Sequence, residues 1–161
     1  MASTALATVG NTSSSPPNTV SATAAPPATV RRAPPPPSTS ALASATVRAA
    51  VESGAVWRES YVATTIGDRI VEGYVDLVYR GPDGLVVVDY KTDAIASEVD
   101  LAAKLDRYRL QGATYALAMQ RATGEAVAAM VFIFCREGVA REVAVDDLGA
   151  AMAAVEAIAA G

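Results

Sequence analysis

The pattern of apolar and polar positions changes at about Ser44. Before that point the chain is rich in alanine, proline, serine and threonine and has few large apolar residues, so residues 1–43 are predicted to form a disordered tail. From residue 44 to residue 161, apolar positions recur at helical or strand-like spacing. These residues are predicted to form one folded domain.

Helices and strands alternate in the pattern of this domain. The expected order is a helix at 44–52, strands at 57–63, 69–79 and 85–91, a long helix at 98–121, strands at 127–135 and 141–145, and a last helix that ends at 160. The segment Gly81-Pro82-Asp83-Gly84 has the residues of a hairpin turn. The pattern therefore predicts an α/β domain of αβββαβ order.

Two acids and a lysine fall on neighbouring predicted strands. Asp89 and Lys91 follow an apolar run, and Asp76 lies on the preceding strand. Alternation along a strand places Asp89 and Lys91 on one face and Tyr90 on the other. Carboxylates bind Mg²⁺ or Mn²⁺, which can activate water for phosphodiester hydrolysis. Asp76, Asp89 and the Tyr90 carbonyl are therefore candidate metal ligands.

Lys91 is the candidate catalytic lysine. It could orient or deprotonate the attacking water, or offset negative charge in the transition state. The alternative is structural: Asp89 and Lys91 would form an ion pair at a strand end, and Asp76 would be an ordinary surface acid.

Three short motifs favour the active-site interpretation. They are G-x-x-D at Gly73 to Asp76, D-Y-K at Asp89 to Lys91, and Q-x-x-x-Y at Gln111 to Tyr115. Over residues 55–134 and in this order, the sequence resembles the RecB-like branch of the PD-(D/E)XK nucleases. The similarity is to the nuclease domain at the C-terminus of AddA-like and UvrD-type helicase–nucleases.

The resemblance implies a restriction-endonuclease-like core, with a mixed central sheet flanked by helices. It also implies metal binding by Asp76 and Asp89, and catalytic roles for Asp76, Asp89, Lys91, Gln111 and Tyr115. Gln111 would position catalytic groups or a DNA phosphate.

The long predicted helix carries Tyr108, Gln111 and Tyr115 on one side. The resemblance implies that this side approaches the active site. Tyr108 is expected only to pack against the sheet. Gly73 either permits a close backbone approach beside the metal site or marks a strand bulge.

The resemblance is incomplete at one ligand position. Related nucleases usually have a histidine or an acid on an upstream helix that completes the metal shell, and this chain has no histidine. Glu59 lies in a segment similar to the R-E-x-P-[FV] strand of relatives and is expected to support the fold or the edge of the site. Glu52 is the alternative replacement for the histidine.

Charge is unevenly distributed along the chain. The net charge is −4, but residues 1–51 contain three arginines and no acid, so residues 52–161 carry −7. Non-specific affinity for DNA comes mainly from cations that neutralise phosphates, so this domain is a poor DNA binder by itself. A helicase motor or helicase–nuclease subunit is the expected partner, and it would deliver a single strand or a duplex end.

Several other classes are not supported. The chain lacks a G-x-x-x-x-G-K-[ST] loop, so it has no ATPase motor of its own. No membrane span is expected, because no uncharged apolar run approaches eighteen residues. Cys135 is the single cysteine, which excludes an intramolecular disulfide and a zinc cluster and makes the cytoplasm the expected compartment.

The sequence thus predicts a Mg²⁺-dependent deoxyribonuclease of the exonuclease type, in double-strand-break repair and recombination, with Mn²⁺ as the other candidate metal. One alternative is a catalytically weakened or inactive remnant that positions DNA or supports assembly. The other is a nuclease for RNA or branched substrates, since D-x-K chemistry does not distinguish sugars.

Overall fold

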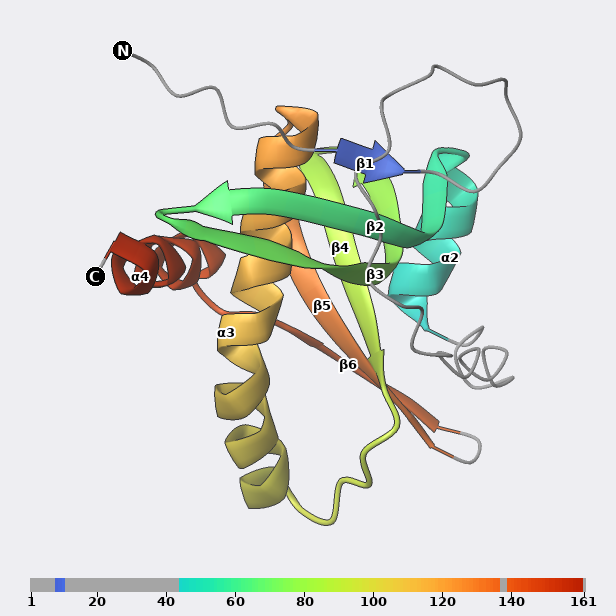
Figure 1. The fold of residues 1–161 in the computed structure, drawn as a ribbon. Helices are drawn as coiled ribbons and strands as arrows, with labels where there is room; N and C mark the ends of the chain where they lie inside the picture. The colour runs from blue at the N-terminus through green and yellow to red at the C-terminus, as the bar shows by residue number, and fades with distance from the viewer. Residues whose placement is uncertain (1–7, 11–43, 137–138, 161) are drawn as a thin grey trace, which may run out of the picture.

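The computed structural model describes residues 8–10, 44–136 and 139–160 (Figure 1). The elements are β1 (Thr8–Gly10), α2 (Ala45–Ser53), β2 (Val56–Ile66), β3 (Arg69–Gly81), β4 (Gly84–Lys91), α3 (Glu98–Thr123), β5 (Val127–Arg136), β6 (Val139–Ala144) and α4 (Leu148–Ala160). Thr8–Gly10 lies within the predicted tail but pairs with β2 as a strand, which the sequence did not predict. The rest of the tail lies outside the described residues, so its disorder stays a prediction.

The strands form one mixed sheet in the order β1-β2-β3-β4-β5-β6. Neighbours are antiparallel except β4 and β5, which run parallel. Parallel strands need a long crossover connection, and α3 provides it. The αβββαβ order and the mixed sheet expected from the sequence are confirmed.

Helices cover both faces of the sheet (Figure 1). Leu85 and Val87 of β4 pack in the core beneath α3, whereas Val86 and Val88 pack on the opposite face with Ala50 of α2. The β4 strand is buried on both faces, which explains its unbroken apolar run. The run in β5 has the same cause, since its side chains also alternate between the two cores.

Helix α3 lies close to the sheet because of Gly112. A Cβ atom at this position would lie 2.8 Å from Cζ of Phe132 and 2.9 Å from Cγ of Met130. The helix begins after Ser97, whose side chain accepts a hydrogen bond from the Asp100 amide, and it ends at Gly124 in the left-handed conformation. The close contact fixes the position of the helix over β4 and β5.

The β2–β3 hairpin is longer than the sequence predicted. Pairing continues to Ile66 and Arg69, because Thr64 and Ile66 are buried rather than exposed. Gly67 makes the turn with a φ of 58°, and a Cβ there would collide with the Ala159 carbonyl of α4. The turn thus packs against the end of α4.

Glu142 of β6 binds the beginning of α2. Its carboxylate accepts hydrogen bonds from the Ala45 amide (2.6 Å), the Thr46 amide (3.1 Å) and the Thr46 hydroxyl. A carboxylate at this end of a helix pairs with amides that have no partner within the helix. Glu142 thereby attaches α2 to the far edge of the sheet.

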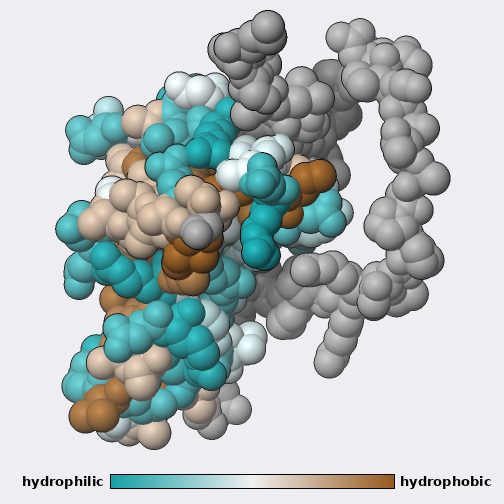
Figure 2. Space-filling view, turned by 60° about the vertical axis from the view of Figure 1, so that its left-hand side comes forward, coloured by the Kyte–Doolittle hydropathy of each residue, from teal (hydrophilic) through white to brown (hydrophobic). Residues whose placement is uncertain are grey.

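Helix α4 buries one side and exposes the other. Leu148, Ala151 and Val155 are buried, whereas Ile158 is 65% exposed. On the face shown in Figure 2, apolar residues form small separate patches among polar ones. Within the described residues, no helix has the length and apolar character needed to cross a membrane.

Candidate active site

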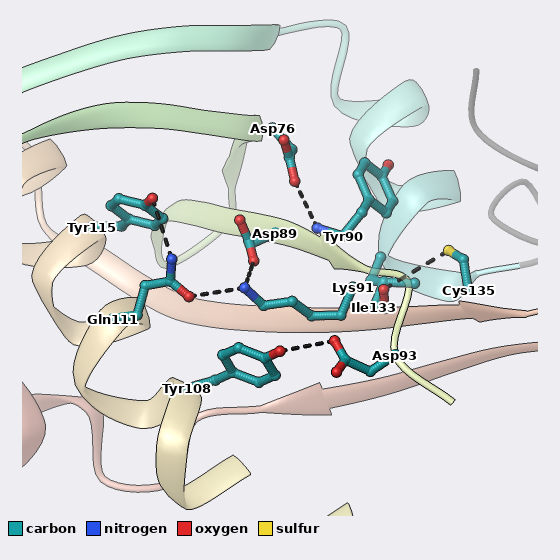
Figure 3. A network of polar contacts seen from close by, with 10 residues as sticks. All are labelled: Asp76, Asp89, Tyr90, Lys91, Asp93, Tyr108, Gln111, Tyr115, Ile133 and Cys135. Atoms are coloured by element: carbon teal, nitrogen blue, oxygen red, sulfur yellow. Dashed lines mark hydrogen bonds and ion pairs between the residues drawn. The ribbon is translucent and has the colours of Figure 1, made fainter. Parts of the chain in front are cut away.

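Asp76 and Asp89 lie where β3 and β4 separate (Figure 3). The ladder between these strands runs from Gly81 and Gly84 to Leu77 and Val88, so the two acids occupy the first positions beyond it. Instead of a further ladder bond, the Tyr90 amide donates a hydrogen bond to Asp76 Oδ2 at 2.8 Å. The two predicted metal ligands are therefore brought together.

Asp89 is buried, whereas Asp76 is half-buried. Asp89 is 7% exposed. Burial raises the pKa of the Asp76 carboxyl above its ordinary value; the Tyr90 amide opposes this, and the nearby Asp89 carboxylate adds to it. Two acids held close together in a partly desolvated place favour a bound cation.

Lys91 points back over Asp89 toward helix α3 (Figure 3). Its Nζ lies 2.6 Å from Asp89 Oδ2 and donates a hydrogen bond to Gln111 Oε1 at 2.8 Å. Asp89 Oδ2 is buried and pairs with this ammonium, and no other hydrogen bond reaches it from the described residues. That oxygen and the Asp76 carboxylate fit the chemistry of a hard divalent cation.

The candidate metal site has two side-chain ligands, Asp76 and Asp89. Among residues 8–10, 44–136 and 139–160, no three histidine, cysteine or acidic side chains form a group that could hold an ion. Mg²⁺ usually binds one or two carboxylates and keeps several waters. The two acids are therefore compatible with a divalent cation that keeps several waters, and the Tyr90 carbonyl is a candidate further ligand.

Glu52, the alternative replacement for the missing histidine, does not join this pair, and neither does Glu59. Glu52 is exposed near the end of α2. Glu59 is level with Asp76 on β2, between the pairs Arg58–Leu77 and Ser60–Val75, and its φ of 48° is left-handed. Such a backbone is uncommon for glutamate and interrupts the ladder beside the site.

Gln111 and Tyr115 of α3 complete one side of the site. Gln111 Nε2 donates a hydrogen bond to the Tyr115 hydroxyl at 3.4 Å, which orients the amide so that Oε1 faces Lys91. Tyr115 packs over Gly73, where a Cβ would lie 2.9 Å from Cε1 of the ring. The structure thus supports the interpretation that Gly73 permits a close approach.

Tyr108 and Asp93 add a contact that sequence analysis missed. The expectation that Tyr108 packs on the sheet is correct, since its ring lies 5.7 Å from that of Phe132. However, Lys91 Nζ also lies 4.0 Å from the Tyr108 ring centroid, and the Tyr108 hydroxyl donates to Asp93 at 2.8 Å. The hydrogen bond to Asp93, together with burial, raises the pKa of Tyr108.

The placement of Tyr108 beside the site, though not its bond to Asp93, had a sequence signal. Tyr108 lies one turn before Gln111 on the same side of α3, and Asp93 lies two residues after Lys91. Once Gln111 is assigned to the site, Tyr108 must lie near it as well.

Comparison with known proteins finds similarity to nucleases. A family model described as the PD-(D/E)XK nuclease superfamily matches residues 21–159. The chain is 41% identical over 58 residues to an ATP-dependent helicase/nuclease subunit of Alkaliphilus metalliredigens, and 40% identical over 58 residues to that of Acetivibrio thermocellus. Each alignment covers 36% of this chain and 5% of the relative.

The protein of the same name from Desulforudis audaxviator is 47% identical over 51 residues, which are 32% of this chain and 4% of that protein. The chain therefore matches only a small part of the length of these relatives.

Proposed function

Because the chain belongs to the PD-(D/E)XK nuclease superfamily, we propose that it hydrolyses phosphodiester bonds of DNA with a divalent cation held by Asp76 and Asp89. The observation that carries the proposal is the convergence of these two carboxylates and Lys91 at the point where β3 and β4 part. A bound Mg²⁺ or Mn²⁺ would activate a water and offset charge on the phosphate.

The roles of the protein groups follow from their contacts. The Tyr90 amide holds Asp76 in place, and its hydrogen bond is made to the charged carboxylate. Lys91 keeps its ammonium between Asp89 and Gln111, where its charge can stabilise the transition state or its Nζ can orient the attacking water. Gln111 and Tyr115 act by fixing the position of that ammonium.

We further propose that a helicase motor or helicase–nuclease subunit delivers the DNA. The relatives are named as helicase/nuclease subunits, and residues 52–161 carry a net charge of −7. Phosphates would be repelled unless a partner supplied most of the affinity. Exonuclease action on strand ends, in break repair and recombination within the cytoplasm, is the role that suits such a partner.

The second candidate function is a weakened or inactive remnant that positions DNA or supports assembly. The observation in its favour is that the described residues provide two metal-binding side chains and no third.

Cleavage of linear single- and double-stranded DNA by the purified chain tests the first proposal. The assay contains Mg²⁺ or Mn²⁺, and Lys91→Ala is the matched control. Metal-dependent cleavage that the variant lacks would support a self-sufficient nuclease. If nothing is cut, titration calorimetry with Mn²⁺ separates the two candidates, because a remnant would show no binding sensitive to Asp89→Ala.

A further inference from the structure

Arg107 lies on α3 one turn before Gln111, beside the candidate active site. Its guanidinium carbon is 5.5 Å from the centroid of the Tyr108 ring. Lys91 Nζ is 4.0 Å from the same centroid. Two cations thus lie against one ring, and Arg107 is the one that is exposed to solvent.

Arg107 has no carboxylate partner within 4 Å in the described part of the chain, unlike five other basic side chains. The basic side chains that do have one within 4 Å are Arg80, Lys91, Lys104, Arg121 and Arg141. Arg109, two positions further on, instead donates to the carbonyls of Asp146 and Asp147. The guanidinium donors of Arg107 are therefore available to a ligand.

Asp100, whose pKa Arg107 helps to lower, already has hydrogen-bond partners of its own. Lys104 contributes most to the lowered pKa of Asp100, and Arg107 contributes least among its causes. The Asp100 carboxylate accepts hydrogen bonds from Lys104 Nζ (2.5 Å) and the Ala96 amide (2.9 Å). Asp100 thus has its own partners and leaves Arg107 exposed.

An exposed arginine at this place would attract DNA phosphates that the acids of the site repel. Asp76 and Asp89 repel the phosphates of an approaching strand, and the rest of the domain is acidic. A guanidinium forms paired hydrogen bonds with phosphate and is more weakly hydrated than an ammonium group. One such group beside the acids would bind the strand through its backbone, without selecting for base sequence.

We propose that Arg107 binds a backbone phosphate next to the scissile one and so sets the position of the strand at Asp89 and Lys91. This inference rests on the proposed nuclease function, since it uses the same site. It assigns α3, through Arg107 and Gln111, as the side of the site along which the strand runs.

The test measures binding of a fluorescein-labelled single-stranded oligodeoxynucleotide by fluorescence anisotropy. The buffer contains Ca²⁺ as the divalent cation, and the measurement is repeated over a series of salt concentrations. Arg107→Ala should weaken binding about 5- to 10-fold and reduce the salt slope by about 0.7, the value for one phosphate contact on a single strand. Arg107→Lys should keep the slope and recover part of the affinity. Circular dichroism checks that each variant is folded.

Arg69→Ala is the matched control. Arg69 is also exposed, but it lies at the β2–β3 turn, about 23 Å from Asp76 along β3. Equal affinity and equal slope in Arg107→Ala and Arg69→Ala would overturn the proposal, as would failure of the wild-type chain to bind the strand at the lowest salt concentration, where phosphate contacts are strongest. If the wild-type chain binds the strand through Arg107 but does not cleave it in Mg²⁺, the role of Arg107 is supported. That result would count only against the proposed nuclease function.

Discussion

The backbone amide of Tyr90 donates a 2.8 Å hydrogen bond to Oδ2 of Asp76. The two candidate metal ligands come from different strands, and this bond ties the first to the strand that carries the second. Tyr90 follows Asp89 directly, so the distance between the carboxylates is set by one short stretch of backbone. The ladder between β3 and β4 ends at this point, and the Tyr90–Asp76 bond keeps the two carboxylates together beyond it.

Asp76→Asn should make the metal-free protein more stable while removing its activity. Burial and the Asp89 charge raise the pKa of Asp76, so the charged carboxylate is a cost to the folded state at neutral pH. Asparagine removes the charge and keeps an oxygen for the Tyr90 amide. We expect a rise of about 3–6 °C in the melting temperature in EDTA, as for roughly 1 kcal/mol in a domain of this size.

The same variant should lose about 100-fold or more in cleavage rate, because a metal ligand is missing. Differential scanning calorimetry and a gel-based cleavage assay would measure the two effects on one preparation. A lower melting temperature combined with normal cleavage would contradict both assignments of Asp76.

Gly73→Ala should disturb the site from a position that carries no functional group. The added Cβ would lie 2.9 Å from Cε1 of Tyr115, and the ring must move. Tyr115 accepts the hydrogen bond that orients Gln111, which in turn holds Lys91. We expect a loss of about 1–3 kcal/mol in the free energy of unfolding, measured with urea, together with slower cleavage.

The double variant Gly73→Ala/Tyr115→Ser separates these effects. Serine leaves room for the new methyl group, so Gly73→Ala should cost less stability in the Tyr115→Ser background than in the wild type, while cleavage stays slow. An equal cost in both backgrounds would show that the ring contact is not the source of the strain.

The sequence alone predicted the parts of the site that lie within a single strand or helix. Asp89 and Lys91 follow a doubly buried apolar strand, and Gln111 and Tyr115 recur at helical spacing, so both their elements and their faces could be predicted. The convergence of the three motifs came from a family resemblance, and the structure agrees with it.

Contacts between distant elements could not be predicted in the same way. The Tyr90–Asp76 bond depends on where two strands part, and the bond of Tyr108 to Asp93 depends on how closely Gly112 lets α3 approach the sheet. Neither distance is encoded in local periodicity. The left-handed backbone at Glu59 likewise has no sequence signal, because glutamate rarely adopts it.

The attachment of α2 to β6 should weaken in acid. Burial tends to raise the pKa of the Glu142 carboxyl, but hydrogen bonds from Thr46, Ser44 and the Ala45 amide outweigh it and hold the pKa below its ordinary value. A folded-state pKa below the unfolded one means that the stabilisation is complete above the unfolded value, near pH 4.5, and is lost as the pH falls through the folded value.

Urea unfolding of the wild type and Glu142→Gln at pH 7 and at pH 3.5 measures this contribution. At pH 7 the variant should be less stable by about 1.5–3 kcal/mol, the usual range for hydrogen bonds to a charged group. The difference should shrink at pH 3.5. A difference of the same size at both pH values would show that the charge on Glu142 is unimportant.

Tyr108 should act on catalysis through its ring more than through its hydroxyl. Lys91 Nζ lies 4.0 Å from the ring centroid, and a cation on an aromatic face is stabilised by about 0.5–2 kcal/mol. Tyr108→Leu should therefore slow cleavage about 3- to 30-fold, since the ammonium loses one of the surfaces that hold it. Tyr108→Phe keeps the ring and loses the bond to Asp93, so its loss should be about threefold or less.

Asp93→Asn is the control for the hydroxyl, because asparagine still accepts a hydrogen bond from Tyr108. Its rate should match that of the wild type. Rates of Tyr108→Phe and Tyr108→Leu that fall equally would assign the effect to the Asp93 bond, and the ring would then be only part of the core. A ring-dependent rate would instead mean that Phe132 and Tyr108, both close to Lys91 Nζ, form an aromatic surface that keeps the ammonium beside Asp89.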